Sequence, residues 1–386
     1  MADRDDDKQK ASPVTVVAAA EPEPASGWQW LTDQSGWDAF SAQARAAGEM
    51  AIDTEFVRRR TYHAQLGLVQ LAAAGQVWLL DPLTQDRRAE LGGLLADPAL
   101  RKWIHAGGED IEVLARWTGA RPQQLLDTQI AAQLCGTGGQ IGYQRLVAEQ
   151  LSVTLSKGEQ QSDWLRRPLT PQQCRYAADD VRYLLPLAQR LLEQVDQRQR
   201  REWLIEDCER QVERVLAPVP AWMHLSERNA GQYPPAVQHR MNQLLHWRQV
   251  EAERRDKPRS WILPNGSVVA LAFAGTDDRA AVIRALQEAG RHDPQRDADR
   301  MLELLASFGP VPADFPLAGA SLEGAEKGQL TLLRKDLEAL AQANDLAPEF
   351  IATRVTLEAR VRTGQWPDSL GRWRLQLLEG IGEKTP

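Results

Sequence analysis

The sequence has little cysteine and no long apolar run, and both absences narrow what the protein can be. Its 386 residues include three widely spaced cysteines, Cys135, Cys174 and Cys208, which form no CxxC pair. We therefore expect small buried thiols rather than a disulfide framework or a cysteine-based zinc site. No apolar stretch reaches the roughly 20 residues of a membrane span, and the acidic start lacks the apolar segment of a signal peptide. We expect a cytoplasmic protein that does not act at a membrane.

Two nucleotide-binding patterns are also missing. No G-xxxx-G-K-[ST] phosphate loop occurs in the chain, which excludes a helicase that depends on such a loop. The glycine-rich segment 136–142 does not fit the dinucleotide pattern GxGxxG, because Ile141 stands where glycine is required. We therefore expect no nucleotide cofactor. The histidines have no close metal-binding spacing, and these are His63, His105, His224, His239, His246 and His292.

The overall composition is that of a globular protein with two or three domains. Hydrophobic residues make up 43% of the chain and charged residues 26%, which are ordinary values for such proteins. The net charge of −7 argues mildly against a surface covered with phosphate contacts, although carboxylates at a metal site contribute to it. Residues 1–26 show no usable periodicity and predict a disordered tail.

The first third of the folded chain predicts a mixed sheet with helices. Residues 50–57, 66–72 and 77–80 read as closely spaced strands, which favours an antiparallel meander. A short strand is predicted at 103–105, and a helix follows before Gly119. Strands followed by alternating strands and helices indicate an α/β domain.

Helices dominate from about Gly142 onward. Thr170 and Pro171 begin a helix with a capping-box pattern, and Pro186 predicts a kink or break further along. Proline-rich segments at 217–220 and 309–312 suggest linkers between units. We expect an α/β domain at 27–215 and two small all-α domains at 221–295 and 299–380.

Two acidic residues in the first strand are the first candidates for chemistry. Asp53 and Glu55 share one face of the strand, because side chains alternate with a period of two. Two neighbouring carboxylates repel each other unless a cation lies between them or water solvates both. The pair is consistent with a divalent metal site, although Asp-x-Glu alone is a weak signal.

Further candidates follow later in the chain. Asp110 opens a helix after two glycines, where it could bind a metal or simply cap the helix. Tyr176 and Asp180 are four residues apart on the capped helix and therefore share a face. Asp180 could hold a metal while the Tyr176 hydroxyl binds an attacking water, or both could be ordinary surface residues. Asp179 points about 100° away on that helix and is the weaker candidate.

Together these carboxylates could hold two divalent ions, about 3.5–4 Å apart in sites of this kind. Such a pair suits phosphodiester hydrolysis, because it activates water and stabilises the charge that develops on the phosphate. The donors are all oxygens, which favours Mg²⁺ or Mn²⁺ over zinc.

Several motifs in this order resemble the ribonuclease D family of the Asp-Glu-Asp-Asp exonucleases, the subtype with tyrosine in its third motif. The matching stretches are AIDTEFVRRRTYHAQLGLVQLA, WIHAGGEDIEVL, LLDTQIAAQL, SDWLRRPLT and QCRYAADDVRYLLPL. The resemblance covers about residues 28–210 and implies an RNase H-like core. It also implies that Tyr176 positions the water. Asp127 in LLDTQ matches as well, but its position reads as structural, as a helix cap would be. The metal ligands that the resemblance implies are Asp53, Glu55, Asp110 and Asp180.

The C-terminal part is similar to HRDC helical domains. The stretch MNQLLHWRQVEAERRDKPRSWILPNGSVVALA carries the first likeness, and ALAQANDLAPEFIATRVTLEARV looks like a more divergent second copy. The first copy has a run of basic residues that could bind nucleic acid or could simply be a solvated face. These basic residues are Arg248, Arg254, Arg255, Lys257 and Arg259.

The family resemblance implies a 3′→5′ exoribonuclease. Its expected substrate is RNA with a free 3′ end, such as tRNA precursors, and its expected products are nucleoside 5′-monophosphates. A DNA 3′→5′ exonuclease is the alternative enzyme, because only contacts with the 2′-hydroxyl separate the two substrates. A non-catalytic RNA-binding scaffold is the other alternative, and the loss of any of the four carboxylates would have favoured it.

Overall fold

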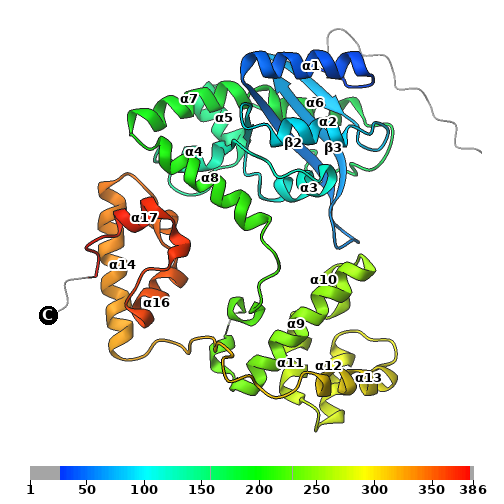
Figure 1. Cartoon of the computed structure of the whole chain (residues 1–386), viewed down its shortest axis with the longest axis vertical. Coiled ribbons are helices and arrows are strands. Elements are labelled where there is room, and N and C mark those ends of the chain that lie inside the picture. The colour runs from blue at the N-terminus through cyan, green and yellow to red at the C-terminus, as the bar shows by residue number, and fades with distance from the viewer. Residues whose placement is uncertain (1–26, 157, 228, 383–386) are drawn as a thin grey trace, which may run out of the picture.

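The computed structural model describes residues 27–156, 158–227 and 229–382. The tail predicted for residues 1–26 lies outside them. An α/β unit occupies one end of the molecule, and two groups of helices lie beyond it (Figure 1). None of the described helices is long and apolar enough to cross a membrane.

The α/β unit is built on a mixed six-stranded sheet with the order β1-β4-β3-β2-β5-β6. The predicted meander is confirmed, because β2, β3 and β4 pair antiparallel in sequence. β1 pairs with β4, β2 with β5 and β5 with β6 in parallel. The expected α/β fold class is therefore confirmed. The strands are β1 Gln29–Trp30, β2 Glu49–Val57, β3 Gln65–Ala73, β4 Gln76–Leu80, β5 Arg101–Ile104 and β6 Leu125–Asp127.

Helices cover both faces of this sheet. Ile52 belongs to a buried cluster with Phe40 of α1 and Ile111 of α3, whereas Ala51 belongs to a second cluster with Val181 of α6. Alternate residues of β2 therefore face different layers. The sequence had not predicted α1 or α2. The helices of this unit are α1 Gln34–Ala47, α2 Arg88–Ala96, α3 Gly108–Thr118, α4 Thr128–Leu134, α5 Tyr143–Leu151, α6 Pro171–Arg182, α7 Leu184–Gln197 and α8 Arg201–Val215.

The start of α6 follows the sequence closely. Thr170 and Gln173 form the predicted capping box, with hydrogen bonds of 3.1 Å to the Gln173 backbone N–H and 2.9 Å to the Thr170 backbone N–H. The break predicted from Pro186 lies at Tyr183, between α6 and α7. Proline lacks the N–H that would bond to the carbonyl of Arg182, four residues earlier, so a continuous helix is disfavoured there.

The C-terminal part is helical, as expected. One group of helices forms its own buried core, to which Met301 and Leu305 of α13 contribute. From the sequence we expected the two helical domains to meet at residues 295–299. These residues lie inside α13, which packs into this core. This group contains α9 Pro235–Arg255, α10 Arg259–Ile262, α11 Asn265–Ala274, α12 Arg279–Glu288 and α13 Pro294–Ser307, preceded by the 3₁₀ turns η1 Met223–Ser226 and η2 Ala230–Gln232.

The second group of helices packs on the α/β unit. Trp373 of α17 stacks on Trp203 of α8 with 4.5 Å between ring centroids, and the buried carboxylate of Asp207 pairs with Arg374. Leu337 of α14 shares a buried cluster with residues of α7 and α8. The members are α14 Ala325–Ala343, α15 Pro348–Ile351, α16 Arg354–Thr363, η3 Asp368–Leu370 and α17 Arg372–Leu377.

The first helical group contacts the connection between β2 and β3. The Asp256 carboxylate accepts hydrogen bonds from the backbone N–H groups of Tyr62, at 3.0 Å, and His63, at 3.3 Å. The amide of Gln249 bonds to the Tyr62 hydroxyl, and the Arg259 guanidinium lies 5.9 Å from the centroid of the Tyr62 ring. The strand that carries Asp53 and Glu55 therefore leads directly to this contact, which lies near α10 in Figure 1.

Candidate metal centre

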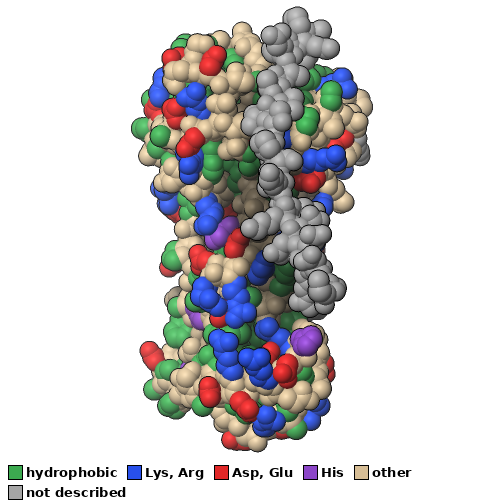
Figure 2. All heavy atoms as spheres, turned by 90° about the vertical axis from the view of Figure 1, so that its right-hand side faces the viewer, with side chains coloured by type: hydrophobic (Ala, Val, Ile, Leu, Met, Phe, Trp, Pro, Cys, Tyr) green, Lys and Arg blue, Asp and Glu red, His purple; other side chains and the backbone are tan. Residues whose placement is uncertain are grey.

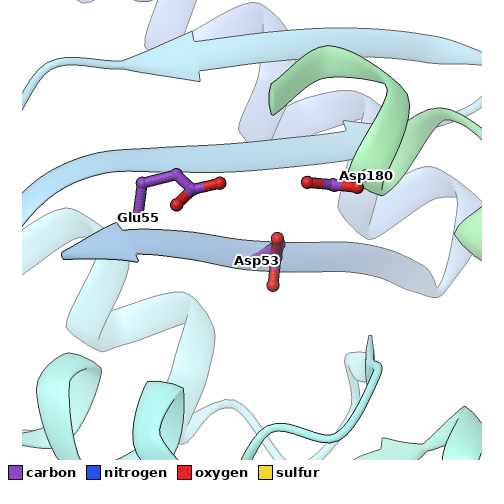
Figure 3. A group of neighbouring side chains, drawn as sticks. All are labelled: Asp53, Glu55 and Asp180. Atoms are coloured by element: carbon purple, nitrogen blue, oxygen red, sulfur yellow. The ribbon is translucent and has the colours of Figure 1, made fainter. Parts of the chain in front are cut away.

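Three carboxylates from two distant parts of the chain converge on one point. Asp53 and Glu55 extend from the same face of β2, and Asp180 comes from α6, which lies across that face (Figure 3). One oxygen of each residue can be chosen so that all three lie within 4.8 Å of one another. The alternation of β2 and the placement of α6 thus bring together three of the four acids predicted as ligands.

Asp110, the fourth predicted ligand, lies near this group but is not part of it. It sits in the first turn of α3, is 8% exposed, and accepts a hydrogen bond from the Thr54 hydroxyl. Its negative charge nevertheless contributes to the raised pKa values of Asp53 and Glu55. The charge of Asp110 therefore acts on Asp53 and Glu55, although its own carboxylate is held by Thr54 on the opposite face of β2.

Burial and mutual repulsion make these carboxylates hard to ionise together. Burial, followed by the charges of Asp180 and Asp110, raises the pKa of Glu55 to about 9. Burial likewise raises the pKa of Asp180 to about 7 and that of Asp110 to about 6, although hydrogen bonds from Tyr176 and Thr54 oppose these shifts. The pKa of Asp53 is well above its usual value, because its carboxylate is desolvated and lies near the charges of the other three acids.

These properties fit a divalent cation. Bound positive charge would relieve the repulsion and lower the raised pKa values. The donors are carboxylate oxygens, which suit hard cations such as Mg²⁺ and Mn²⁺. Gln70 lies opposite Asp53 in the β2–β3 pairing, is fully buried, and its side-chain amide has no hydrogen-bond partner among the described residues.

Tyr176 lies beside the acidic group. Its hydroxyl hydrogen-bonds to Asp180, one turn further along α6. Burial, followed by the charges of Asp180 and Glu55, holds the pKa of this phenol well above its usual value, so the hydroxyl keeps its proton. Asp179 turns away and pairs with Arg182 at 3.0 Å, in keeping with its place as the weaker candidate.

The structure brings one aromatic residue to the centre that the sequence did not single out. The pKa of the Tyr143 hydroxyl is raised by burial and then by the charges of Asp180 and Asp53, and this hydroxyl donates to the Asp179 carbonyl at 3.2 Å. Its ring lies 5.5 Å from that of His105. Tyr143 follows a glycine-rich connection, and no periodicity relates it to the acidic residues, so only the folded chain reveals its position.

Asp127 has the structural role that the sequence suggested. Its carboxylate caps α4 by accepting from the Gln129 backbone N–H at 2.8 Å. It also accepts from the backbone N–H groups of Ala106, at 2.9 Å, and Gly107, at 3.0 Å. These bonds fix the turn that leads from β5 into α3, and therefore the place of Asp110.

One of the five residues predicted to form a basic surface is buried instead, so that prediction is wrong for Arg248. Arg248 is 5% exposed, and its guanidinium donates to the carbonyl of Leu263 at 3.1 Å and to the side chain of Asn265 at 2.6 Å, so it fixes the core of the helical group. Lys257 and Arg259 are exposed.

The other two predicted basic residues are exposed but paired. Arg254 and Arg255 both form ion pairs with Glu251, at 2.7 and 3.2 Å. Viewed from the side of α10 and α13, Figure 2 shows Lys and Arg side chains gathered between the two ends of the molecule.

A cleft of about 700 Å³ opens at the end of β2 that follows Glu55. Phe56 and Val57 line it directly after Glu55 in β2, and Gln161 lies on another side of it. The Arg59 guanidinium donates to the Gln161 carbonyl at 2.8 Å and so ties the two walls together. The three converging carboxylates are not among its lining residues, and Glu55 precedes this lining along β2.

Comparisons with known proteins agree with this geometry. A family model described as 3′-5′ exonuclease matches residues 28–196. The chain is 38% identical to ribonuclease D from Xanthomonas oryzae over 355 residues, which cover 91% of this chain and 96% of the relative. It is 33% identical to ribonuclease D from Pseudomonas paraeruginosa over 366 residues, covering 91% and 95% of the two chains.

Solved structures show the same likeness. The crystal structure of ribonuclease D from Escherichia coli, described as an exoribonuclease involved in structured RNA processing, matches with a TM-score of 0.79 at 28% identity. The match covers 92% of this chain and 97% of that one. The catalytic core of RRP6 from Trypanosoma brucei matches with a TM-score of 0.54 at 19% identity, which shows a shared fold.

Proposed function

The chain belongs to the ribonuclease D family of 3′-5′ exoribonucleases, and we propose that it shortens RNA from a free 3′ end by two-metal hydrolysis. As an enzyme of this family it is a hydrolase that acts on RNA. The proposal adds the mechanism, the products and the residues. The proposed metal ligands are Asp53, Glu55, Asp110 and Asp180.

The observation that carries the proposal is the convergence of three partly buried carboxylates from β2 and α6. Divalent ions, Mg²⁺ or Mn²⁺, would lower the pKa of the attacking water and offset the negative charge that develops on the phosphate. Asp53, Glu55 and Asp180 would hold these ions between β2 and α6. Asp110, held by Thr54, would complete the set from α3.

Tyr176, held by Asp180, acts on the attacking water in this proposal. The hydrogen bond between them orients the phenol, whose raised pKa keeps it protonated and able to hold the water by a hydrogen bond. Water attacks the phosphorus of the last phosphodiester, and the bond between phosphorus and the 3′ oxygen breaks. The shortened RNA keeps a 3′-hydroxyl, and the terminal residue leaves as a nucleoside 5′-monophosphate.

We propose tRNA precursors in the cytoplasm as the substrates. The E. coli relative is described as acting in structured RNA processing, which supports this class. The α9–α13 and α14–α17 groups are proposed to be HRDC-like domains that bind the body of such an RNA. The exposed residues proposed to contact it are Arg254, Arg255, Lys257 and Arg259, and Arg248 is removed from that set.

The proposal is tested by comparing three substrates. They are a tRNA precursor with a short 3′ extension, and a single-stranded RNA and a single-stranded DNA that have the sequence of that extension. With Mg²⁺, we expect the precursor and the RNA to release nucleoside 5′-monophosphates, identified by mass spectrometry, and the DNA to react at least tenfold more slowly. Release of nucleoside 3′-monophosphates would contradict the bond cleavage. Equal rates on RNA and DNA would contradict the preference for RNA.

A further inference from the structure

The segment SDWLRRPLT, one of the stretches that carry the family resemblance, lies outside the acidic group, and the structure shows what it contacts. Its Arg167 guanidinium binds both oxygens of Asp81, at 2.6 and 2.7 Å. The same group donates to the carbonyl of Gly67 at 2.6 Å and to that of Trp164 at 2.9 Å. Arg167 therefore fastens this segment to β3 and to the turn after β4.

Trp164 is pressed against the sheet by this fastening. A Cβ atom at Gly67 would lie 2.5 Å from the Trp164 carbonyl oxygen, so only glycine allows this approach. The indole is 1% exposed and shares a buried cluster with Leu68 and Leu79. Its Nε1 has no hydrogen-bond partner among the described residues, so the indole acts through its shape.

The indole also packs against the proposed water-binding residue. The ring centroids of Trp164 and Tyr176 are 6.2 Å apart, with 39° between the planes. This distance falls within the range of favourable aromatic pairs. A contact chain thus runs from Asp81 through Arg167 and Trp164 to the ring whose hydroxyl bonds to Asp180.

We propose that Arg167 and Trp164 are positioning residues that hold the Tyr176 ring, and with it the hydroxyl, in place beside Asp180. Neither side chain belongs to the group of converging carboxylates or lines the cleft, so we expect their replacement to leave metal and RNA binding unchanged. A ring displaced by about 1 Å can cost about 100-fold in rate when geometry limits the reaction. The inference rests on the role proposed for Tyr176.

The steady-state test replaces Arg167 with Lys. Lysine keeps the positive charge but cannot form the two parallel hydrogen bonds that the guanidinium makes with the Asp81 carboxylate. We expect Arg167→Lys to lower kcat about tenfold and to leave KM for RNA unchanged. The Kd for RNA in chelator should also be unchanged. Arg166→Lys is the matched control, because Arg166 is the exposed neighbour in the same segment. An unchanged kcat in folded Arg167→Lys would overturn the proposal.

A double-mutant cycle separates positioning from general destabilisation. In a Tyr176→Phe background, which lacks the hydroxyl, Arg167→Lys should lower kcat by less than twofold. An equal loss in both backgrounds shows that Arg167 acts on something else, and the proposal fails. If Arg167→Lys does not fold, Trp164→Leu replaces it, with Trp164→Phe as the conservative variant that retains an aromatic ring and should retain most of the activity.

A measurement without catalysis keeps the inference separate from the proposed function. The chain has five tyrosines, and fluorotyrosine labelling with ¹⁹F NMR of the full metal-free chain can identify Tyr176 by its absence in Tyr176→Phe. We expect one sharp Tyr176 signal in the wild type and in Trp164→Phe, and a broadened or split signal in Trp164→Leu. An unchanged signal in Trp164→Leu would overturn the inference. If Tyr176→Phe keeps full kcat while Trp164→Leu alters the signal, the role of the hydroxyl fails but the ring is held as proposed.

Discussion

The Thr54 hydroxyl donates a hydrogen bond to the buried carboxylate of Asp110. Thr54 stands between Asp53 and Glu55 in the sequence, but its side chain points to the opposite face of β2. One strand therefore presents two carboxylates on one face and fixes a third acid, from α3, through the other.

Removing this hydroxyl should weaken metal binding. Thr54→Val keeps the shape of the side chain but leaves the Asp110 carboxylate without its donor, and the pKa of Asp110 should rise further above about 6. Loss of a group that orients a metal ligand typically costs 10–100-fold in metal affinity, so we expect the Mg²⁺ concentration for half-maximal activity to rise about tenfold. Thr54→Ser, which retains the hydroxyl, is the control. The same Mg²⁺ requirement in Thr54→Val and the wild type would remove Asp110 from the proposed ligand set.

The metal-free protein should lose stability as the pH rises. Glu55 has a pKa of about 9 in the folded protein and an ordinary value of 4.5, so the folded state holds this proton more tightly than the unfolded state. The resulting stability is fully present below pH 4.5 and is lost as the pH rises toward 9. Glu55→Gln should therefore be more stable than the wild type at pH 8 in chelator, and the difference should shrink at pH 5. Urea unfolding at the two pH values measures this, and a difference that does not change with pH would refute it.

Replacing Gln70 should increase the stability of the metal-free protein, whereas most substitutions in a protein core decrease it. Its buried amide has no partner among the described residues, so Gln70→Leu should remove a desolvated polar group and stabilise the metal-free protein by about 1 kcal/mol. Gln173→Leu is the matched control, because the side chain of Gln173 accepts from Thr170 at 2.9 Å and its loss should destabilise by about 1 kcal/mol. A loss of stability in both variants would show that Gln70 is hydrogen-bonded in solution.

The contact between α8 and α17 should contribute strongly to stability. Asp207 is 7% exposed and accepts from the Trp373 indole at 3.0 Å and from Arg374 at 2.9 Å. Asp207→Ala leaves the largely buried guanidinium of Arg374 without its anion, which should cost about 3 kcal/mol in the free energy of unfolding. Glu213→Ala, on an exposed part of α8, is the control, since its pair with Arg121 is long, at 3.9 Å, and exposed. Similar unfolding midpoints for the two variants would mean that the α14–α17 group does not depend on this pair.

Local patterns predicted much of this architecture because they depend on neighbours in sequence. The period of two in β2 placed Asp53 and Glu55 on one face, and the capping box set the first residue of α6. Asp127 was identified as structural, and it caps α4. Each of these features follows from rules that act within a few residues.

Contacts between residues far apart in the sequence could not be predicted from such local rules. The bond from Thr54 to Asp110 joins residues 56 positions apart, and Tyr143 reaches the centre only because α5 packs beside α7. Arg248 was predicted to be exposed because it lies in a basic run, yet its place on α9 turns it into the core. A run of basic residues does not indicate which side chains are exposed when the helix is packed on several sides.

The most direct test of the account follows the degradation of a 5′-labelled RNA by the full chain, with Mg²⁺ or with chelator. The wild type should produce a ladder that shortens one nucleotide at a time from the 3′ end only with Mg²⁺. Asp53→Asn and Asp180→Asn should reduce the rate at least 100-fold while binding RNA as tightly as the wild type in chelator. Shortening by the wild type in chelator, or ordinary rates in both variants, would contradict a metal centre built from these carboxylates.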